Sequence, residues 1–375
     1  MALFHAASEN FEDITVRRCK KVFDCKVKQL RKRIEAATAH YLAHRFSEII
    51  KTIEKQFKGY GRHPDDSLFL NLAIPVANAS ENKTFDAFER VVHAAWKDRS
   101  KIVECNGDLG KVSQHINLAS KQHGTNGDCY LYPEVSANVQ AYVRSRTAQP
   151  GIYLFVDTGA GTVDQSVFIY KDDQGPKLAY LSAEVSPLGS SQIEIRALQK
   201  SNGNGDLEVF RRNKEAGQLH ADEMKHALVS IAQDLSSPAL KALGETYRKG
   251  IGTGQIQTIR VIFGGGGHLE DPYSQGVRGG MTEFFALRDS GGGFADGQYI
   301  PPFDPDTIPE IGIPIPSDLE FPKNAKASLW FKRLSVAYGL SFPRFDLADY
   351  RLPHEIRDGV PLKRGKLVGN EYIEN

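Results

Sequence analysis

The chain has few cysteines, no long hydrophobic run and almost no net charge, and each of these features excludes a class of protein. It has 375 residues, four cysteines and a formal net charge of +1. Cys19, Cys25, Cys105 and Cys129 form no C-x-x-C pair, which disfavours a zinc site and indicates free thiols in a reducing compartment. The balanced charge disfavours nucleic acid as a partner.

Membrane and secretory segments are also not predicted. No apolar run approaches the roughly 18–20 residues that a membrane helix needs. The N-terminal stretch MALFHAASENFEDITVRR lacks the long apolar core of a signal peptide, so the sequence predicts a cytoplasmic protein without a membrane partner. The length is sufficient for one large domain or two ordinary ones.

Strand-like and helical patterns alternate along the chain, which predicts an α/β architecture. Apolar residues at helical spacing predict helices over 22–57, 80–97, 220–249 and 327–342. Strand patterns are found at 68–76, in the hairpin 152–170, and at the starts of 127–145, 177–195 and 258–267. The Gly- and Pro-rich stretch 289–322 is interpreted as a surface insertion, and the residues after 342 as a polar tail.

Residues 152–170, IYLFVDTGAGTVDQSVFIY, are the most informative stretch, because two aspartates flank a glycine-rich turn between two apolar strands. The segment VDTGA is similar to the catalytic loop of pepsin-type proteases. That chemistry needs two carboxylates sharing one proton, and Asp157 begins the only D-T-G in the chain. A pepsin-like chain should also be nearly all strand. The protease interpretation is therefore disfavoured.

The tip of this hairpin has the composition of a phosphate-binding loop. The turn 159–161 offers closely spaced backbone N–H groups with little side-chain bulk, and the Thr162 hydroxyl adds a donor. Asp157 is placed to hold Mg²⁺ through water, and Asp164 to orient the turn or the water shell of the metal. The alternative is an ordinary hairpin in which these residues only satisfy turn geometry.

Three segments resemble motifs of the ATPase domain of DnaK-type heat-shock chaperones, within the actin and sugar-kinase superfamily. FVDTGAGTVDQSVFI is similar to the second phosphate motif, with Ala160 in place of a glycine. EVSANVQAY is similar to the first connecting helix, with Glu134 in the position of a metal-linked glutamate. PLGSSQIEI is similar to a further glycine segment, in which Gly189 is kept and Ser190 replaces the second glycine.

Two later segments follow in the order of the same family. IRVIFGGGGHLEDP resembles the adenosine motif, and the resemblance places Gly264–Gly266 against ribose and adenine, with His268 at the position of an arginine. RLSVAYGLSF resembles the second connecting helix, with Ala337 and Gly339 at helix-crossing positions. In the segment 210–217, Lys214 and Glu215 are candidates for an adenine clamp.

The resemblance implies a set of site residues. The catalytic residues would be Glu134, Asp157 and Asp164, the metal ligands Asp157 and Glu134, and the nucleotide-binding residues Gly159, Ala160, Gly161, Thr162, Gly189, Gly264, Gly265, Gly266 and His268. The implied cofactors are ATP or ADP with Mg²⁺.

One family motif has no counterpart in the sequence. Residues 1–70 contain no D-x-G-[ST] and no assignable catalytic lysine, and no peptide-binding domain follows residue 342. The expected fold is therefore an N-terminally incomplete actin-like ATPase fold with ribonuclease-H-like lobes. Three explanations stay open: a truncated product, a degenerate relative that does not hydrolyse ATP, or a separate polypeptide that supplies the missing segment.

The expected organisation has three parts: a partial lobe I over 1–150, lobe II over 151–326, and the second connecting helix with a tail over 327–375. The expected function is adenine-nucleotide binding, with ATP hydrolysis only if the first phosphate loop is supplied. The alternative is a non-catalytic interaction module with a vestigial nucleotide site.

Two smaller signals have plain interpretations. The basic run 16–33 is interpreted as a solvated helix face in preference to a nucleic-acid or lipid patch, although it is also consistent with an interface that favours self-association. His220 and His226 are six residues apart and so do not share a helix face as i, i+4 residues do, which indicates surface residues.

Overall fold

The computed structural model describes residues 2–121, 128–201, 205–216, 218, 222–252, 256, 258–267, 271–287, 293–295, 298–300, 304, 308–322 and 327–358. The chain forms two compact units. The first comprises Met1–Ile74 with Asn78–Tyr132, and the second comprises Pro75–Ala77 with the chain from Pro133 onward. The predicted division at residue 150 into two lobes stays a prediction. The first predicted connecting helix, EVSANVQAY at 134–142, belongs to the second unit.

The first unit is mainly helical. Its helices are α1 (Ala2–Ala7), α2 (Ile14–Phe23), α3 (Val27–Gln56), α5 (Asn82–Lys97), α6 (Arg99–Glu104) and α7 (Leu109–Lys121), with α4 (Val76–Ala79) at its boundary and the strands β1 (Leu70–Ile74) and β2 (Cys129–Pro133) paired in one sheet. The single helix predicted over 22–57 is wrong at its start. Asp24 has a φ of 40° in the left-handed region and ends α2, so that α3 begins separately at Val27.

The second unit is built on a five-stranded mixed sheet in the order β6-β3-β4-β5-β9. The strands β3 (Gly151–Thr158), β4 (Val163–Asp172) and β5 (Pro176–Ser186) form an antiparallel meander, which confirms the predicted hairpin. β6 (Arg260–Gly264) is parallel to β3, and β9 (Asp349–Arg351) is parallel to β5. The predicted α/β architecture is therefore present.

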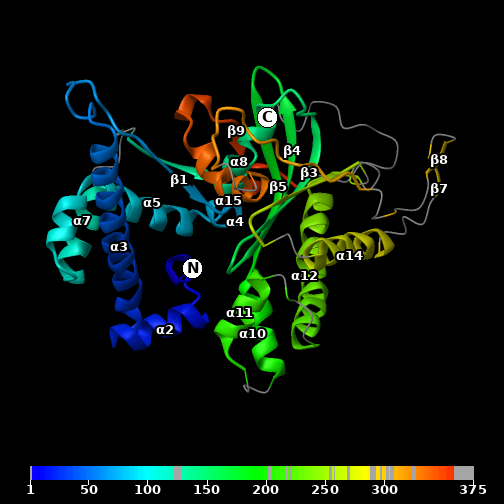
Figure 1. The fold of residues 1–375 in the computed structure, drawn as a ribbon, viewed down its shortest axis with the longest axis horizontal. Coiled ribbons are helices and arrows are strands. Elements are labelled where there is room, and N and C mark those ends of the chain that lie inside the picture. Colours follow the sequence, from blue (N-terminus) through cyan, green and yellow to red (C-terminus); the bar gives the residue numbers. More distant parts are fainter. Residues whose placement is uncertain are drawn as a thin grey trace. The chain divides into compact units, whose positions relative to one another are not determined.

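Helices cover both faces of this sheet (Figure 1). Leu154 and Val156 point to the face packed by α10 (Ser191–Lys200), α12 (Asp222–Arg248) and α14 (Asp271–Leu287), where the main apolar core lies. Tyr153 points to the opposite face, where its hydroxyl bonds to that of Tyr142 at 2.9 Å. The opposite face holds α8 (Glu134–Asn138) and α9 (Gln140–Val143) and, packed against these two, α15 (Ala327–Leu340). The further elements are α11 (Leu207–Glu215), β7 (Gly293–Ala295), β8 (Gln298–Ile300), η2 (Arg344–Asp346) and η3 (Pro353–Glu355).

Two segments predicted to lie outside the fold have described residues that belong to it. In the segment interpreted as a surface insertion, Ile308 is buried in the core and Glu310 forms a parallel bridge with Val261 of β6. In the predicted polar tail, β9 extends the sheet and Leu347 is buried. β6 lies beside β3, and the residue-310 segment lies beside β6, both in parallel orientation. Together with the meander, these strands have the sheet order of a ribonuclease-H-like lobe.

The two predicted connecting helices pack against each other through Gly339 of α15. A Cβ atom at this position would overlap the backbone carbonyl of Ala137 in α8. Ala337, the other predicted crossing residue, is exposed instead. The crossing was therefore predicted correctly at one position and wrongly at the other.

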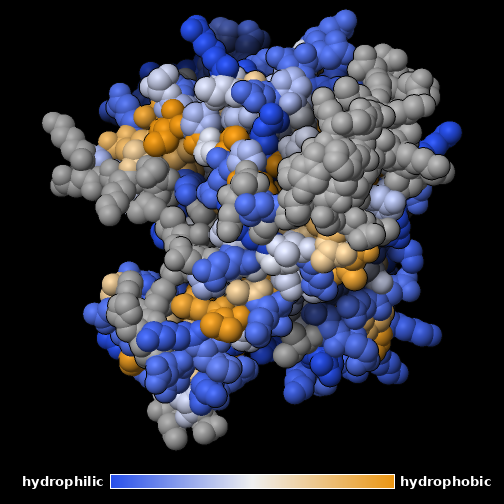
Figure 2. Space-filling view, turned by 90° about the vertical axis from the view of Figure 1, so that its right-hand side faces the viewer, coloured by the Kyte–Doolittle hydropathy of each residue, from blue (hydrophilic) through white to orange (hydrophobic). Residues whose placement is uncertain are grey.

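The surface is mostly hydrophilic on the face drawn in Figure 2, with small and separate hydrophobic patches. Trp330, which is 49% exposed, is one of the exposed large apolar side chains of the second unit. Within the part of the chain that the structure describes, no helix is both long and apolar enough to cross a membrane.

Candidate functional site

The tip of the β3–β4 hairpin is a four-residue loop, 159–162. It is closed by the Gly159 N–H, which donates to the Thr162 carbonyl at 2.9 Å. The N–H groups of Ala160, Gly161 and Thr162 have no acceptor among the described residues. Consecutive unsatisfied N–H groups of a tight turn are the donors that bind a phosphate oxygen. The loop therefore has the donors that its predicted phosphate-binding role requires, and the role itself stays a prediction.

The start of α10 holds this loop in place. The N–H groups of Gly189, Ser190 and Ser191 donate to the carbonyls of loop residues 161, 159 and 160 at 3.3, 2.9 and 2.8 Å. Because the loop carbonyls point to α10, the loop position depends on the close approach at Gly189. A Cβ atom there would lie 2.5 Å from three backbone atoms of the loop.

We expect Gly189→Ala to destabilise the second unit by about 1–3 kcal/mol, the usual range for overpacking, and to weaken any ligand bound at the loop. Thermal unfolding followed by circular dichroism measures the first effect. Gly161→Ala is the matched control, because a Cβ at Gly161 meets nothing within 4 Å. Equal melting temperatures for the two variants would show that a Cβ atom at residue 189 does not collide with the loop.

Two carboxyl groups lie side by side at the base of the loop. Asp157 and Asp164 are direct partners in the antiparallel register, and Gly264 is the partner of Asp157 on its other side. Like charges directly opposite each other destabilise a strand pair. Asn138 of α8 offsets part of this, since its amide donates to Asp157 Oδ2 at 3.0 Å.

Glu134 adds a third carboxyl group, and the pKa values of all three are raised. Burial and the Asp157 charge raise the pKa of Glu134 to about 7. Burial raises the pKa of Asp157 to about 6, while the Asn138 hydrogen bond acts in the opposite direction. Burial, Glu134 and Asp157 raise the pKa of Asp164 well above its usual value. The three groups therefore share a site that holds too much negative charge for full ionisation.

Two buried oxygens at this site have no hydrogen-bond partner among the described residues. They are Oδ1 of Asp164 and Oδ1 of Asn138. Oxygen-only donors with surplus negative charge suit a hard cation. Within the described residues, however, no three acidic, histidine or cysteine side chains converge closely enough to hold an ion directly. The residues thus fit Mg²⁺ held through its water shell, as predicted for Asp157, and do not fit a direct protein cage.

The glycine turn after β6 lies against the same carboxyl group. Gly265 has a φ of 74°, and a Cβ atom on it would overlap the Thr158 carbonyl and a carboxylate oxygen of Asp157. A Cβ on Gly264 would lie 3.1 Å from the Asn138 amide. The fold therefore brings Gly264 and Gly265 together with Asp157 and Asn138. His268 lies outside the described residues.

Some site residues were not predicted individually. Asn138 is four residues after Glu134, and this helical spacing could have identified it as a second polar group on the same face. Lys214, a candidate for an adenine clamp, donates instead to the buried Glu194 at 2.7 Å and to the Ser190 carbonyl at 2.9 Å. Its ammonium group therefore joins α11 to the start of α10. Glu215 is exposed.

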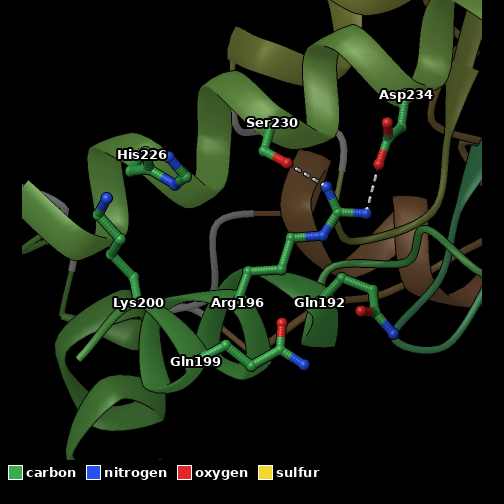
Figure 3. Close-up of a pocket in the computed structure, with 7 residues that line it drawn as sticks. All are labelled: Gln192, Arg196, Gln199, Lys200, His226, Ser230 and Asp234. Atoms are coloured by element: carbon green, nitrogen blue, oxygen red, sulfur yellow. Dashed lines mark hydrogen bonds and ion pairs between the residues drawn. The ribbon is translucent and has the colours of Figure 1, made fainter. Parts of the chain in front are cut away.

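A separate groove of about 530 Å³ lies between α10 and α12 (Figure 3). Arg196 crosses it and donates to Ser230 Oγ at 2.6 Å and to Asp234 Oδ2 at 2.7 Å. Lys200 and His226 line the same groove. His226 is exposed, as predicted for a surface residue, and His220 lies outside the described residues. The groove shares α10 with the hairpin site.

No sequence-family profile and no curated protein sequence matches the chain. Among solved structures, similar ones are described as "PilM-PilN type IV pilus biogenesis complex" (15% identity, 63% of this chain and 57% of that chain, TM-score 0.33) and "pCBH ParM non-polymerisable quadruple mutant" (13%, 58% and 62%, 0.36). A third is ethanolamine utilization protein EutJ from Carboxydothermus hydrogenoformans (14%, 64% and 65%, 0.35).

These three structures are distant from the chain, with identities of 13–15% and TM-scores of 0.33–0.36. The matched region spans less than two thirds of the length of each of them. The α/β fold of this chain is seen in its own sheet order, with the meander, the parallel β6 and the two packed helices α8 and α15.

Proposed function

We propose that the chain binds an adenine nucleotide at the β3–β4 hairpin. The observation that supports this best is that backbone N–H donors and acidic side chains lie next to each other at the hairpin tip. The loop 159–162 offers backbone N–H groups without acceptors among the described residues, and Asp157 and Asp164 lie at its base with raised pKa values. Phosphates suit the donors, and a phosphate-bound Mg²⁺ suits the carboxyl groups.

Each residue has a defined role in this proposal. The loop N–H groups bind phosphate oxygens, while Asp157, Asp164 and Glu134 accept hydrogen bonds from metal-bound water. Asn138 fixes the orientation of the Asp157 carboxyl group. Mg²⁺, when bound with nucleotide, would neutralise phosphate charge. Gly264–Gly266 would lie along the nucleoside.

Hydrolysis is proposed only with a second phosphate-binding element. Phosphoryl transfer depends on positioning and on charge stabilisation around the transferred group. The described site offers one hairpin, and the sequence has no D-x-G-[ST] in residues 1–70 to offer another. We propose that a protein partner or a preceding segment supplies this second element. We also propose that the resemblance to DnaK-type ATPase domains reflects a shared nucleotide site.

A second candidate function is a non-catalytic interaction module with a vestigial nucleotide site. Ala160 and Ser190, which replace glycines of the resembled motifs, favour it. The raised pKa values of Glu134 and Asp157 also allow the site to exist without a cation, because protons can neutralise part of its charge.

Calorimetric titration with Mg²⁺-ATP separates the two functions. We expect saturable binding that Asp157→Ala weakens at least tenfold, because the variant removes the central carboxyl group. Asp172→Ala is the control, since Asp172 is an exposed aspartate at the far end of the same hairpin. No heat up to about 1 mM nucleotide, where the binding free energy is only about −4 kcal/mol, would favour the interaction module.

A further inference from the structure

Arg333 reaches the glycine turn from a different part of the sequence. A Cβ atom on Gly266 would lie 3.2 Å from Nε, 3.5 Å from Cγ and 3.9 Å from Cδ of Arg333. The side chain of this α15 residue therefore passes over Gly266. Any molecule that lies against Gly266 must either contact Arg333 or displace it.

The guanidinium group of Arg333 has N–H donors that no described residue uses. Arg333 is exposed, and no hydrogen bond or ion pair joins its side chain to another described residue. Its guanidinium group lies over the indole ring of Trp330, one turn earlier on α15, with Cζ 5.9 Å from the ring centroid. An arginine over an aromatic ring is attracted to its face. Trp330 thus holds the guanidinium near the turn, and no described residue accepts a hydrogen bond from its N–H groups.

We propose that Arg333, supported by Trp330, forms one wall of the nucleoside site at the glycine turn and stacks on the base. The proposal rests on the proposed nucleotide-binding function and adds a residue that no sequence motif identified. A planar guanidinium stacks on planar rings, which an ammonium group does not do. The wall therefore selects for a ligand with a base and not for phosphate alone.

Binding constants for two probes test the contact. We expect Arg333→Ala to weaken Mg²⁺-ADP binding about tenfold and to leave Mg²⁺-pyrophosphate binding unchanged, because pyrophosphate has no base. Arg333→Lys should also weaken Mg²⁺-ADP binding, because lysine keeps the positive charge but lacks the planar guanidinium group. Arg248→Ala, an exposed arginine at the end of α12, is the control and should bind as the wild type does.

Fluorescence gives a second and independent measurement. Trp96 and Trp330 are the two tryptophans of the chain, so Trp96→Phe leaves Trp330 as the single fluorophore. We expect Mg²⁺-ADP to change the emission of Trp330 saturably, with the same midpoint as in the binding experiment. Melting temperatures of the Arg333 variants should equal that of the wild type, because the side chain has no other described partner.

The possible results separate this proposal from the proposed function. If Mg²⁺-ADP binds and Asp157→Ala weakens it, but Arg333→Ala leaves it unchanged or tightens it, the wall is overturned and the nucleotide function stands. Equal weakening of both probes by Arg333→Ala would assign the arginine to the phosphates and also overturn the wall. If neither probe binds the wild type up to about 1 mM, both proposals are overturned.

Discussion

Asp157→Asn is expected to raise the melting temperature of the ligand-free protein at pH 8 and to remove Mg²⁺-nucleotide binding. The wild-type carboxyl group is buried beside Asp164, with Glu134 adding charge to the same site, so ionisation is unfavourable in the folded state. An amide of the same shape has no charge, and its oxygen can still accept the hydrogen bond of Asn138. The change thus improves stability where it abolishes function.

The pH dependence follows from the direction of the pKa shift. The pKa of Asp157 is raised from 3.8 to about 6, so the folded state holds a proton that the unfolded state has released between these values. Stability therefore falls as the pH rises through this window, and the loss is complete above the folded pKa. A pKa shift of about two units corresponds to roughly 3 kcal/mol of folding stability. Glu134, with a pKa of about 7, extends the fall toward neutral pH.

Thermal unfolding of the two proteins at pH 5 and pH 8 measures this effect. We expect a gain of about 1–3 kcal/mol for Asp157→Asn at pH 8, or roughly 3–8 °C, and roughly half of that gain at pH 5, which lies midway between the pKa values of 3.8 and about 6. Asp172→Asn is the control, because Asp172 is exposed and should change the melting temperature at neither pH. A lower melting temperature for Asp157→Asn at pH 8 would show that the carboxylate is stabilised by a partner in the folded protein.

The sheet was predictable where its signals are local. The β3–β4 hairpin and β6 are continuous apolar strands next to glycine turns, so the sequence shows both the strand and its end. The residue-310 segment and β9 were not predictable, because one bridge or three residues leave no periodic pattern. The residue-310 segment pairs with the edge of β6, and β9 pairs with the edge of β5, so their positions depend on strands that are already in the sheet.

The residues of the candidate site also divide into those that a local sequence pattern predicts and those that it does not. The loop 159–162 and Asp157 were predicted as site residues from neighbouring residues alone, because a tight turn between two strands is a local structure. Asn138 and Arg333 act through tertiary contacts, with Asp157 and with Gly266. Such contacts need the packing of α8 and α15 on the sheet, and a motif of neighbouring residues does not encode that packing.

The crossing of α8 and α15 gives the last prediction. We expect Gly339→Val to lower the melting temperature strongly, by about 6–12 °C for a loss of about 3 kcal/mol. Any side chain at Gly339 overlaps the Ala137 carbonyl, which is backbone and can move only with α8. Helix propensity acts against this result, because valine favours a helix more than glycine does. A measured loss would therefore come from packing.

Ala337→Val is the matched control for this change. Ala337 is two residues away on the same helix and exposed, so its replacement by the same residue should cost only the propensity difference of roughly 0.5 kcal/mol. The site supplies a second measurement, because α8 carries both Glu134 and Asn138. If Gly339→Val moves α8, Asp157 loses the hydrogen bond that lowers its pKa, and Mg²⁺-nucleotide binding should weaken at pH 6 more than at pH 8. Equal melting temperatures for the two valine variants would mean that the helices do not cross at Gly339, and the position of Asn138 beside Asp157 would then need another explanation.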